Sequence, residues 1–129
     1  MAGPKLDGAG TEKMKTLDES LIRLHRLHGL VETYALAIKR SQPPATYLMP
    51  IRRALPTLAS LLKGQFGMIS DQAMSLNTGV SRGSNEQVRV RMLREGIAAL
   101  RQALDVAIVR VKENHAEEKV VKTPGSAAD

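Results

Sequence analysis

The chain has 129 residues, of which 43% are hydrophobic and 25% charged; this composition fits one globular domain and excludes a multi-domain machine. Aromatic residues make up 2% and cysteine is absent, which excludes an aromatic-rich β core, disulfides and thiolate metal sites. The 19 basic residues outnumber the 13 acidic ones, and the net charge of +6 favours a polyanionic partner.

Both ends of the chain lack hydrophobic periodicity. Residues 1–13 mix glycine, proline and both charge signs without an apolar run, which predicts a disordered tail and neither a signal peptide nor a membrane anchor. Residues 119–129 are rich in small and turn-forming residues and are also predicted to be a disordered tail. The helical bundle is therefore predicted over residues 14–118. No segment reaches the roughly 18 consecutive apolar residues of a membrane span, so we expect a cytoplasmic protein without membrane contact.

The first predicted helix covers residues 14–40. Its apolar residues recur at intervals of three and four, from Leu17 to Ile38, and so lie on one helical face. Thr16 or Asp18 is suited to cap its start. The sequence SQPP that follows predicts the end of the helix, because proline has no amide donor and disfavours helical geometry in the residue before it.

The second helical segment covers residues 46–76, and its apolar register shifts by one at Gly64 and Gly67. Each glycine costs a helix about 1 kcal/mol relative to alanine, so the segment either continues with a stutter or breaks into two helices there. Pro56 would kink a helix that began at Thr46, which places the predicted start closer to Leu55. Turn-forming residues end the segment before residue 84.

The third predicted helix follows Ser84, its expected N-cap, with Gln87 placed as in a capping box. Ala99 and Ala103 lie beside its apolar seam, and such small side chains let a neighbouring helix approach closely. The seam is an uninterrupted heptad pattern formed by Val90, Leu93, Ile97, Leu100, Leu104, Ala107 and Val111.

Long helices joined by short loops pack as antiparallel neighbours. The sequence predicts an all-α bundle with up-down topology, made of three long helices, or of four if the second segment breaks between Gly64 and Gly67. Leucine-rich heptads with few aromatic residues are also typical of subunits whose remaining apolar face is covered by another copy. We therefore expect a homo-oligomer.

Patterns for catalysis or metal binding are weak. His25 and His28 are three residues apart on one predicted helix, but no Glu-x-x-His pair elsewhere completes a metal site, and His115 has no evident partner. The chain has no serine elbow, P-loop or dinucleotide-binding fingerprint. We expect no enzyme activity, no cofactor and no metal; a metal or small ligand in the bundle core is a third hypothesis.

Positive charge is concentrated in two stretches of the sequence. Residues 39–63 contain five basic residues and no acid, and residues 82–94 contain four arginines and one glutamate. In an antiparallel bundle we expect these clusters to form two basic caps at opposite ends, one where the first helix ends and the second begins, the other where the third helix begins. The predicted nucleic-acid-binding residues are Lys39, Arg40, Arg52, Arg53, Arg82, Arg89, Arg91 and Arg94.

Arginine predominates among these residues, and its planar guanidinium binds phosphate oxygens in a bidentate manner. Because aromatic residues are scarce, we expect electrostatic, salt-dependent binding of DNA or RNA with weak sequence specificity. Two alternatives stay open. In the first, the basic surface either has no role or contacts a protein. In the second, the chain is an assembly module that docks a partner helix on the face carrying Ala99 and Ala103.

Two stretches resemble a known family: IRRAL at residues 51–55 and SLNTGVSRGS at residues 75–84. They are similar to proteins encoded in intervening sequences of large-subunit ribosomal RNA genes and to the accessory variability determinants of diversity-generating retroelements. The resemblance implies a basic four-helix bundle that assembles as a pentamer, with nucleic acid and a reverse transcriptase as partners of the retroelement members. The resemblance implies that Arg52, Arg53, Arg82 and Ser84 correspond to surface and turn positions of the family.

Overall fold

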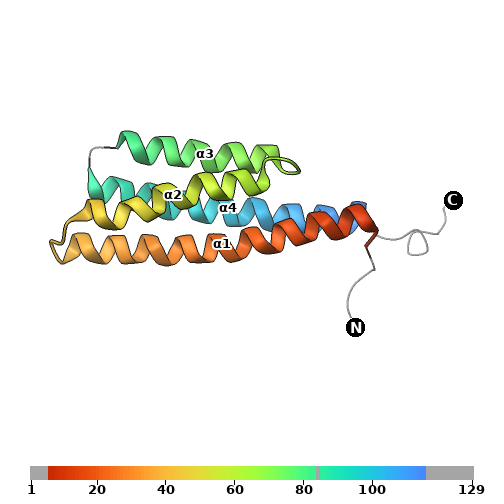
Figure 1. The fold of residues 1–129 in the computed structure, drawn as a ribbon, viewed down its shortest axis with the longest axis horizontal. Helices are drawn as coiled ribbons and strands as arrows, with labels where there is room; N and C mark the ends of the chain where they lie inside the picture. The colour runs from red at the N-terminus through yellow and green to blue at the C-terminus, as the bar shows by residue number, and fades with distance from the viewer. Residues whose placement is uncertain (1–5, 84, 116–129) are drawn as a thin grey trace.

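The computed structural model describes residues 6–83 and 85–115 as four helices (Figure 1). Consecutive helices pack against each other, and the first also packs against the last, which closes a ring of antiparallel neighbours. The predicted all-α bundle with up-down topology is confirmed, in its four-helix version. The helices are α1 (Gly8–Lys39), α2 (Pro44–Leu62), α3 (Gly67–Arg82) and α4 (Glu86–Asn114).

The second predicted segment breaks at the glycines. The amides of Gln65 and Phe66 both donate to the carbonyl oxygen of Leu62, which closes the last turn of α2. The half-buried Phe66 then packs against the core at the start of α3. The weak helix propensity of Gly64 and Gly67 makes this the least costly place for the chain to reverse.

Helix α1 starts at Gly8, whereas the sequence predicted helix only from residue 14. Its N-cap is Asp7, whose carboxylate accepts a hydrogen bond from the Gly10 amide at 2.6 Å, so neither Thr16 nor Asp18 caps it. Residues 8–13 of the predicted N-terminal tail at 1–13 are therefore helical. Residues 1–5 of that tail, the predicted tail at 119–129 and the predicted end of the bundle at 118 lie outside the described residues.

Helix α2 begins at Pro44 and contains both Pro50 and Pro56, so a start near Leu55 was wrong. Pro44 occupies the first helical turn, where a missing amide costs nothing because that donor would have no partner inside the helix. The interior prolines each remove a helical hydrogen bond, but burial of the apolar face offsets this loss. That face consists of Ile51, Leu55, Leu58, Ala59 and Leu62.

Helix α4 is capped by Asn85, whose side-chain oxygen accepts hydrogen bonds from the amides of Gln87 at 2.8 Å and Val88 at 3.2 Å. The cap thus lies one residue after Ser84, the predicted position, which is itself outside the described residues. The heptad seam is buried as predicted, apart from the half-buried Ala107.

The core is aliphatic, and Tyr34 is its one fully buried aromatic side chain among the described residues. Gly96 allows α3 to approach α4, because a Cβ atom at this position would lie 2.6 Å from both terminal carbons of Leu76. Helices α1 and α4 are longer than α2 and α3, and their free ends extend past the α2–α3 turn (Figure 1). No helix in the described part of the chain is both long and apolar enough to cross a membrane.

Candidate nucleic-acid interface

The two basic stretches lie at the same end of the bundle, except for Lys63, which is the C-cap of α2 at the other end. The α1–α2 turn, the end of α3 and the start of α4 all lie at the left of Figure 1, because the extra reversal at Gly64–Gly67 returns the chain to the end it had left. The expectation of two caps at opposite ends, which assumed three helices, was wrong. We call this end of the molecule the basic end, defined by Lys39, Arg40, Arg52, Arg53, Arg82, Arg89, Arg91 and Arg94.

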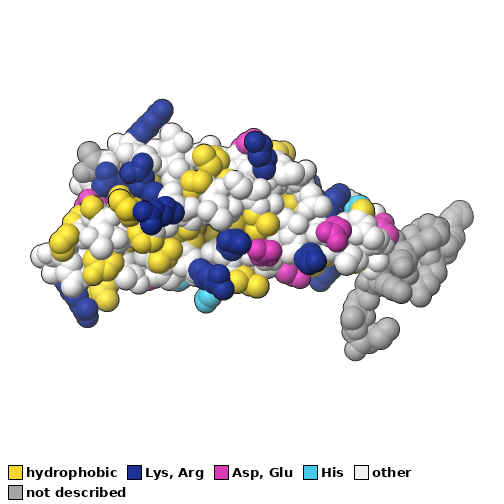
Figure 2. Space-filling view, in the orientation of Figure 1, with side chains coloured by type: hydrophobic (Ala, Val, Ile, Leu, Met, Phe, Trp, Pro, Cys, Tyr) yellow, Lys and Arg dark blue, Asp and Glu magenta, His cyan; other side chains and the backbone are white. Residues whose placement is uncertain are grey.

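Six of these eight side chains are exposed and form no ion pair with any other described residue. Helix α2 contributes no acidic residue at all. Figure 2 shows a cluster of lysine and arginine side chains over this end and further ones along the rest of the face, while most of the acidic side chains visible on the same face lie toward the other end. The six unpaired residues are Lys39, Arg40, Arg52, Arg53, Arg82 and Arg91.

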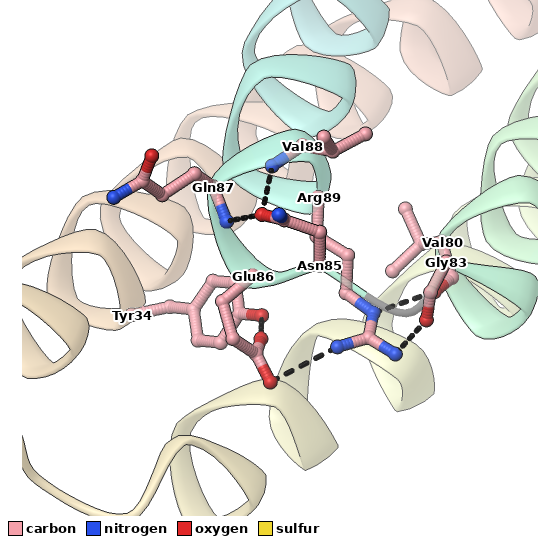
Figure 3. Close-up of polar contacts among 8 residues, drawn as sticks. All are labelled: Tyr34, Val80, Gly83, Asn85, Glu86, Gln87, Val88 and Arg89. Atoms are coloured by element: carbon pink, nitrogen blue, oxygen red, sulfur yellow. Dashed lines mark hydrogen bonds and ion pairs between the residues drawn. The ribbon is translucent and has the colours of Figure 1, made fainter.

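Arg89 is engaged within the protein (Figure 3). Its guanidinium donates to the carbonyl oxygens of Val80, at 3.0 Å, and Gly83, and forms a 3.0 Å ion pair with Glu86. The side chain is only 15% exposed. Arg89 therefore holds the end of α3 against the start of α4 and is poorly placed to contact a phosphate.

Tyr34 joins this cluster from α1. The tyrosine is fully buried, and its hydroxyl donates a hydrogen bond to the carboxylate of Glu86. Burial raises the pKa of Tyr34 to about 12, and the neighbouring Glu86 carboxylate adds to the increase. Although desolvation opposes the charged form, hydrogen bonds to Glu86 and Tyr34 raise the pKa of Arg89. The cluster thus joins α1, the end of α3 and the start of α4 at the basic end.

Arg94 is also paired, although it is exposed. Its Nε and Nη2 atoms donate to the two carboxylate oxygens of Glu32 on α1, at 2.9 and 2.7 Å. Hydrogen bonding to Arg94 lowers the pKa of Glu32, which keeps the pair charged. Because Glu32 neutralises Arg94, this arginine presents less positive charge to a ligand than its neighbour Arg91.

Arg26 is a candidate residue that the sequence reasoning missed. It lines a groove of about 370 Å³ between α1 and α2, together with Arg53 and with Arg23, which pairs with Glu19 at 2.9 Å. Arg26 is exposed and has no ion pair within the described residues. Helical periodicity places Arg26 on the surface, but only the packing of α1 on α2 places it beside Arg53.

Lys39 and Arg91 both line a different groove, between α1 and α4, which Glu32 and Glu95 also line. This groove has a volume of about 980 Å³ and an apolar floor that includes Val90 and the 45% exposed Leu36. Cations therefore border two sides of α1 near the basic end, and the basic surface is broader than either sequence cluster alone.

His25 and His28 are exposed on α1 and do not form a metal site with other described residues. The Nε2 atom of His28 lies 3.8 Å from Glu32, which already binds Arg94. Within residues 6–83 and 85–115, no group of three or more histidine and acidic residues is arranged to hold a metal ion.

Comparison of the chain with protein-family models, with curated proteins and with solved structures gives no match. The fold and the site therefore define the class by themselves: a four-helix up-down bundle with arginine-rich surface at one end.

Proposed function

We propose that the protein is a non-enzymatic, cytoplasmic accessory protein that binds nucleic acid through its basic end. The observation that carries the proposal is that six exposed basic side chains, none in an ion pair with another described residue, lie at one end of the bundle and come from all four helices. Guanidinium groups in such numbers favour contact with several phosphates of one polyanion, because each contact releases condensed counterions.

The expected contacts are to the backbone of DNA or RNA. Tyr34 is buried, Tyr47 is half-buried and Phe66 packs at the α2–α3 turn, so the basic end has no exposed aromatic platform for stacking bases. Phosphate contacts position a protein without reading the base sequence. We therefore propose weakly sequence-specific binding with strong salt dependence.

The test is the double charge reversal Arg52→Glu with Arg53→Glu. Binding of labelled duplex DNA and of a structured RNA is measured by fluorescence anisotropy over a range of salt concentrations. Losing two phosphate contacts should weaken binding and reduce the slope of log affinity against log salt by about 1.8 for DNA.

The matched control reverses Lys15 and Lys112, which are exposed near the free ends of α1 and α4 and form no ion pair within the described residues. It changes the net charge by the same amount and should leave the slope nearly unchanged. A slope that is the same for both double variants and the wild type would reject the basic end as the interface.

We also propose that the protein works as a homo-oligomer. The resemblance of residues 51–55 and 75–84 to the ribosomal intervening-sequence proteins and retroelement accessory determinants supports this, since those proteins are basic four-helix bundles that assemble. Light scattering after size exclusion, with and without nucleic acid, measures the mass. A monomer under every condition would reject the oligomer.

A second candidate function is docking of a partner helix on α4. A specific observation favours it: Ala99 is exposed and Ala103 half-buried, and both line an open groove at the end of the bundle far from the basic end. The two functions use different surfaces, so one protein can have both.

A further inference from the structure

An apolar groove lies between the start of α3 and the C-terminal half of α4. It exists because α3 begins only at Gly67, which leaves the adjoining face of α4 uncovered beyond that point. The groove has a volume of about 690 Å³ and extends along α4 from Ala99 to Asn114. At 1.5 Å per residue this is a length of about 22 Å, or four turns of a helix.

The lining has the shape and chemistry of a helix-packing surface. Ala99, Ala103 and Ala107 recur every four residues on α4, and their small side chains leave room for larger side chains from a partner. Beside them, Met68 is 87% exposed and Val106 is 45% exposed. These apolar side chains would be removed from water by a helix placed alongside α4.

The charged residues in the described part of the chain that line the groove are all basic. Lys13 from α1 and Arg110 from α4 lie toward its far end, and no aspartate or glutamate among residues 6–83 and 85–115 lines it. Arg110 is exposed and has no ion pair within the described residues. The groove therefore combines an apolar floor with positive charge at one end.

Lys13 is held in place by contacts between the free ends of α1 and α4. Its Nζ atom lies 3.2 Å from Nε2 of His115, and Nδ1 of His115 lies 3.3 Å from the carboxylate of Asp7. An ammonium group only donates, so Nε2 accepts and the ring proton is on Nδ1, toward Asp7. The amide of Asp7 also donates to the backbone oxygen of His115 at 2.9 Å. This arrangement fixes a positive charge at the mouth of the groove.

We propose that this groove binds an amphipathic helix of a partner protein whose acidic residues face Lys13 and Arg110. The proposal rests on the second candidate function, helix docking on α4. It adds the charge of the partner and the orientation of its helix relative to α4. Charge complementarity favours an acidic partner over a second copy of this chain, which carries a net charge of +6. The groove is open along its length, which suits a helix better than a small molecule that must be enclosed.

The direction of the partner helix follows from electrostatics. Acidic residues are most favourable in the first turn of a helix, at the positive end of its dipole. A helix that places its first turn beside Lys13 and Arg110 runs antiparallel to α4, because these residues lie near the C-terminal end of α4. Its apolar face then lies over Ala107, Ala103 and Ala99 in turn.

The experiment uses the full-length chain and two labelled synthetic four-turn peptides, whose leucines are spaced three and four residues apart. One peptide has glutamates in its first turn and the other has lysines there. Fluorescence anisotropy should show binding of the glutamate peptide at least tenfold tighter than that of the lysine peptide. The double variant Lys13→Glu with Arg110→Glu should reverse this preference.

The variant Ala103→Arg fills the groove and should weaken binding of the glutamate peptide at least tenfold. Its control is Ala98→Arg, which adds the same side chain to α4 at an exposed position that lines the separate α1–α4 groove. Circular dichroism checks that both variants keep the helix content and thermal midpoint of the wild type.

The outcomes distinguish helix docking in the groove from the acidic character of the partner. If both peptides bind equally and Ala103→Arg blocks them, helix docking stands and the acidic partner is rejected. If neither peptide binds, or if Ala103→Arg has no effect, both are rejected. A loss of self-association in Ala103→Arg would identify a second copy as the occupant. Peptide binding only after removal of residues 116–129 would identify that segment instead. Either result rejects the separate partner.

Discussion

Individual arginines at the basic end have different roles because their neighbours differ. Arg89 is largely buried and bound by Glu86 and two backbone carbonyl oxygens, while Arg91, two residues away, is exposed without an ion pair among the described residues. A buried charge must be compensated by partners, so Arg89 contributes to the geometry of the turn. An exposed guanidinium keeps its hydration and can exchange it for phosphate oxygens.

Tyr34 leads to a pH-dependent prediction at the residue scale. Its pKa is about 12 in the folded protein and 10.0 when unperturbed, so its stabilising effect is complete below pH 10 and is lost as the pH rises toward 12. The variant Tyr34→Phe should be less stable than the wild type at pH 7 by about 1 kcal/mol, through the lost hydrogen bond to Glu86.

This stability difference should shrink by about 1 kcal/mol at pH 11, because only the wild type has a tyrosine at position 34 that ionises on unfolding. Urea denaturation of both proteins at pH 7 and at pH 11 measures it. Other titrating groups are common to both proteins and cancel in the comparison. A difference that stays constant between the two pH values would contradict the assigned role of Tyr34.

At the scale of elements, tertiary contacts rather than intrinsic propensity set where the helices begin and how closely they approach. Helix α1 starts at Gly8 because Asp7 caps it and also contacts His115, the C-cap residue of α4. Gly10 lies at this crossing: a Cβ atom added to it would be 2.5 Å from Cβ of His115. A contact this short to an atom next to the backbone requires the two helices to move apart.

The glycines of α1 provide a matched pair of substitutions. Gly29→Ala should stabilise the protein by about 0.5–1 kcal/mol, because alanine favours the helix and nothing lies within 4 Å of the added Cβ. Gly10→Ala should lower stability despite the same gain in propensity, because the added Cβ displaces α4. Thermal unfolding of both variants tests this, and midpoints that rise together would refute the close contact at Gly10.

At the scale of the whole molecule, the surfaces are divided between the two ends. The basic end presents six exposed cations that form no ion pair among the described residues, and the far end presents an apolar groove lined with alanines and two cations. Glu32 limits the positive charge of the basic end by neutralising Arg94 across α1 and α4. The balance of charge at this end therefore depends on a contact between helices that are distant in sequence.

Removing this neutralisation should strengthen nucleic-acid binding. Glu32→Gln frees Arg94, so we expect tighter binding and a salt slope steeper by about 0.9 if Arg94 gains one phosphate contact. The loss of the exposed ion pair should cost less than about 1 kcal/mol of stability. Glu95→Gln is the control, since it removes the same charge from an exposed residue that forms no ion pair within the described part of the chain. Equal effects of both variants would contradict a specific release of Arg94.

Much of the fold was predictable because helical periodicity is a local property. The seam from Val90 to Val111 predicted the buried face of α4. The glycines at 64 and 67 indicated where the second segment could break, and α2 and α3 are separated there. The predicted start of α2 near Leu55 was wrong, because burial of Ile51 and Leu55 outweighs the hydrogen bonds that the interior prolines remove. Ser84 and Asn85 are both good caps, and propensity alone does not choose between adjacent candidates.

The sequence by itself determined the helical class, the aliphatic core and the two clusters of positive charge, because each depends on composition or on spacing along one helix. Only the tertiary structure decided that both clusters lie at one end, that Arg89 and Arg94 are paired, and that Arg26 joins Arg53. The extra reversal between α2 and α3 means that α4 begins at the end of the bundle opposite to the one expected for three helices. Such relations join residues far apart in the chain, so they arise only when the helices pack.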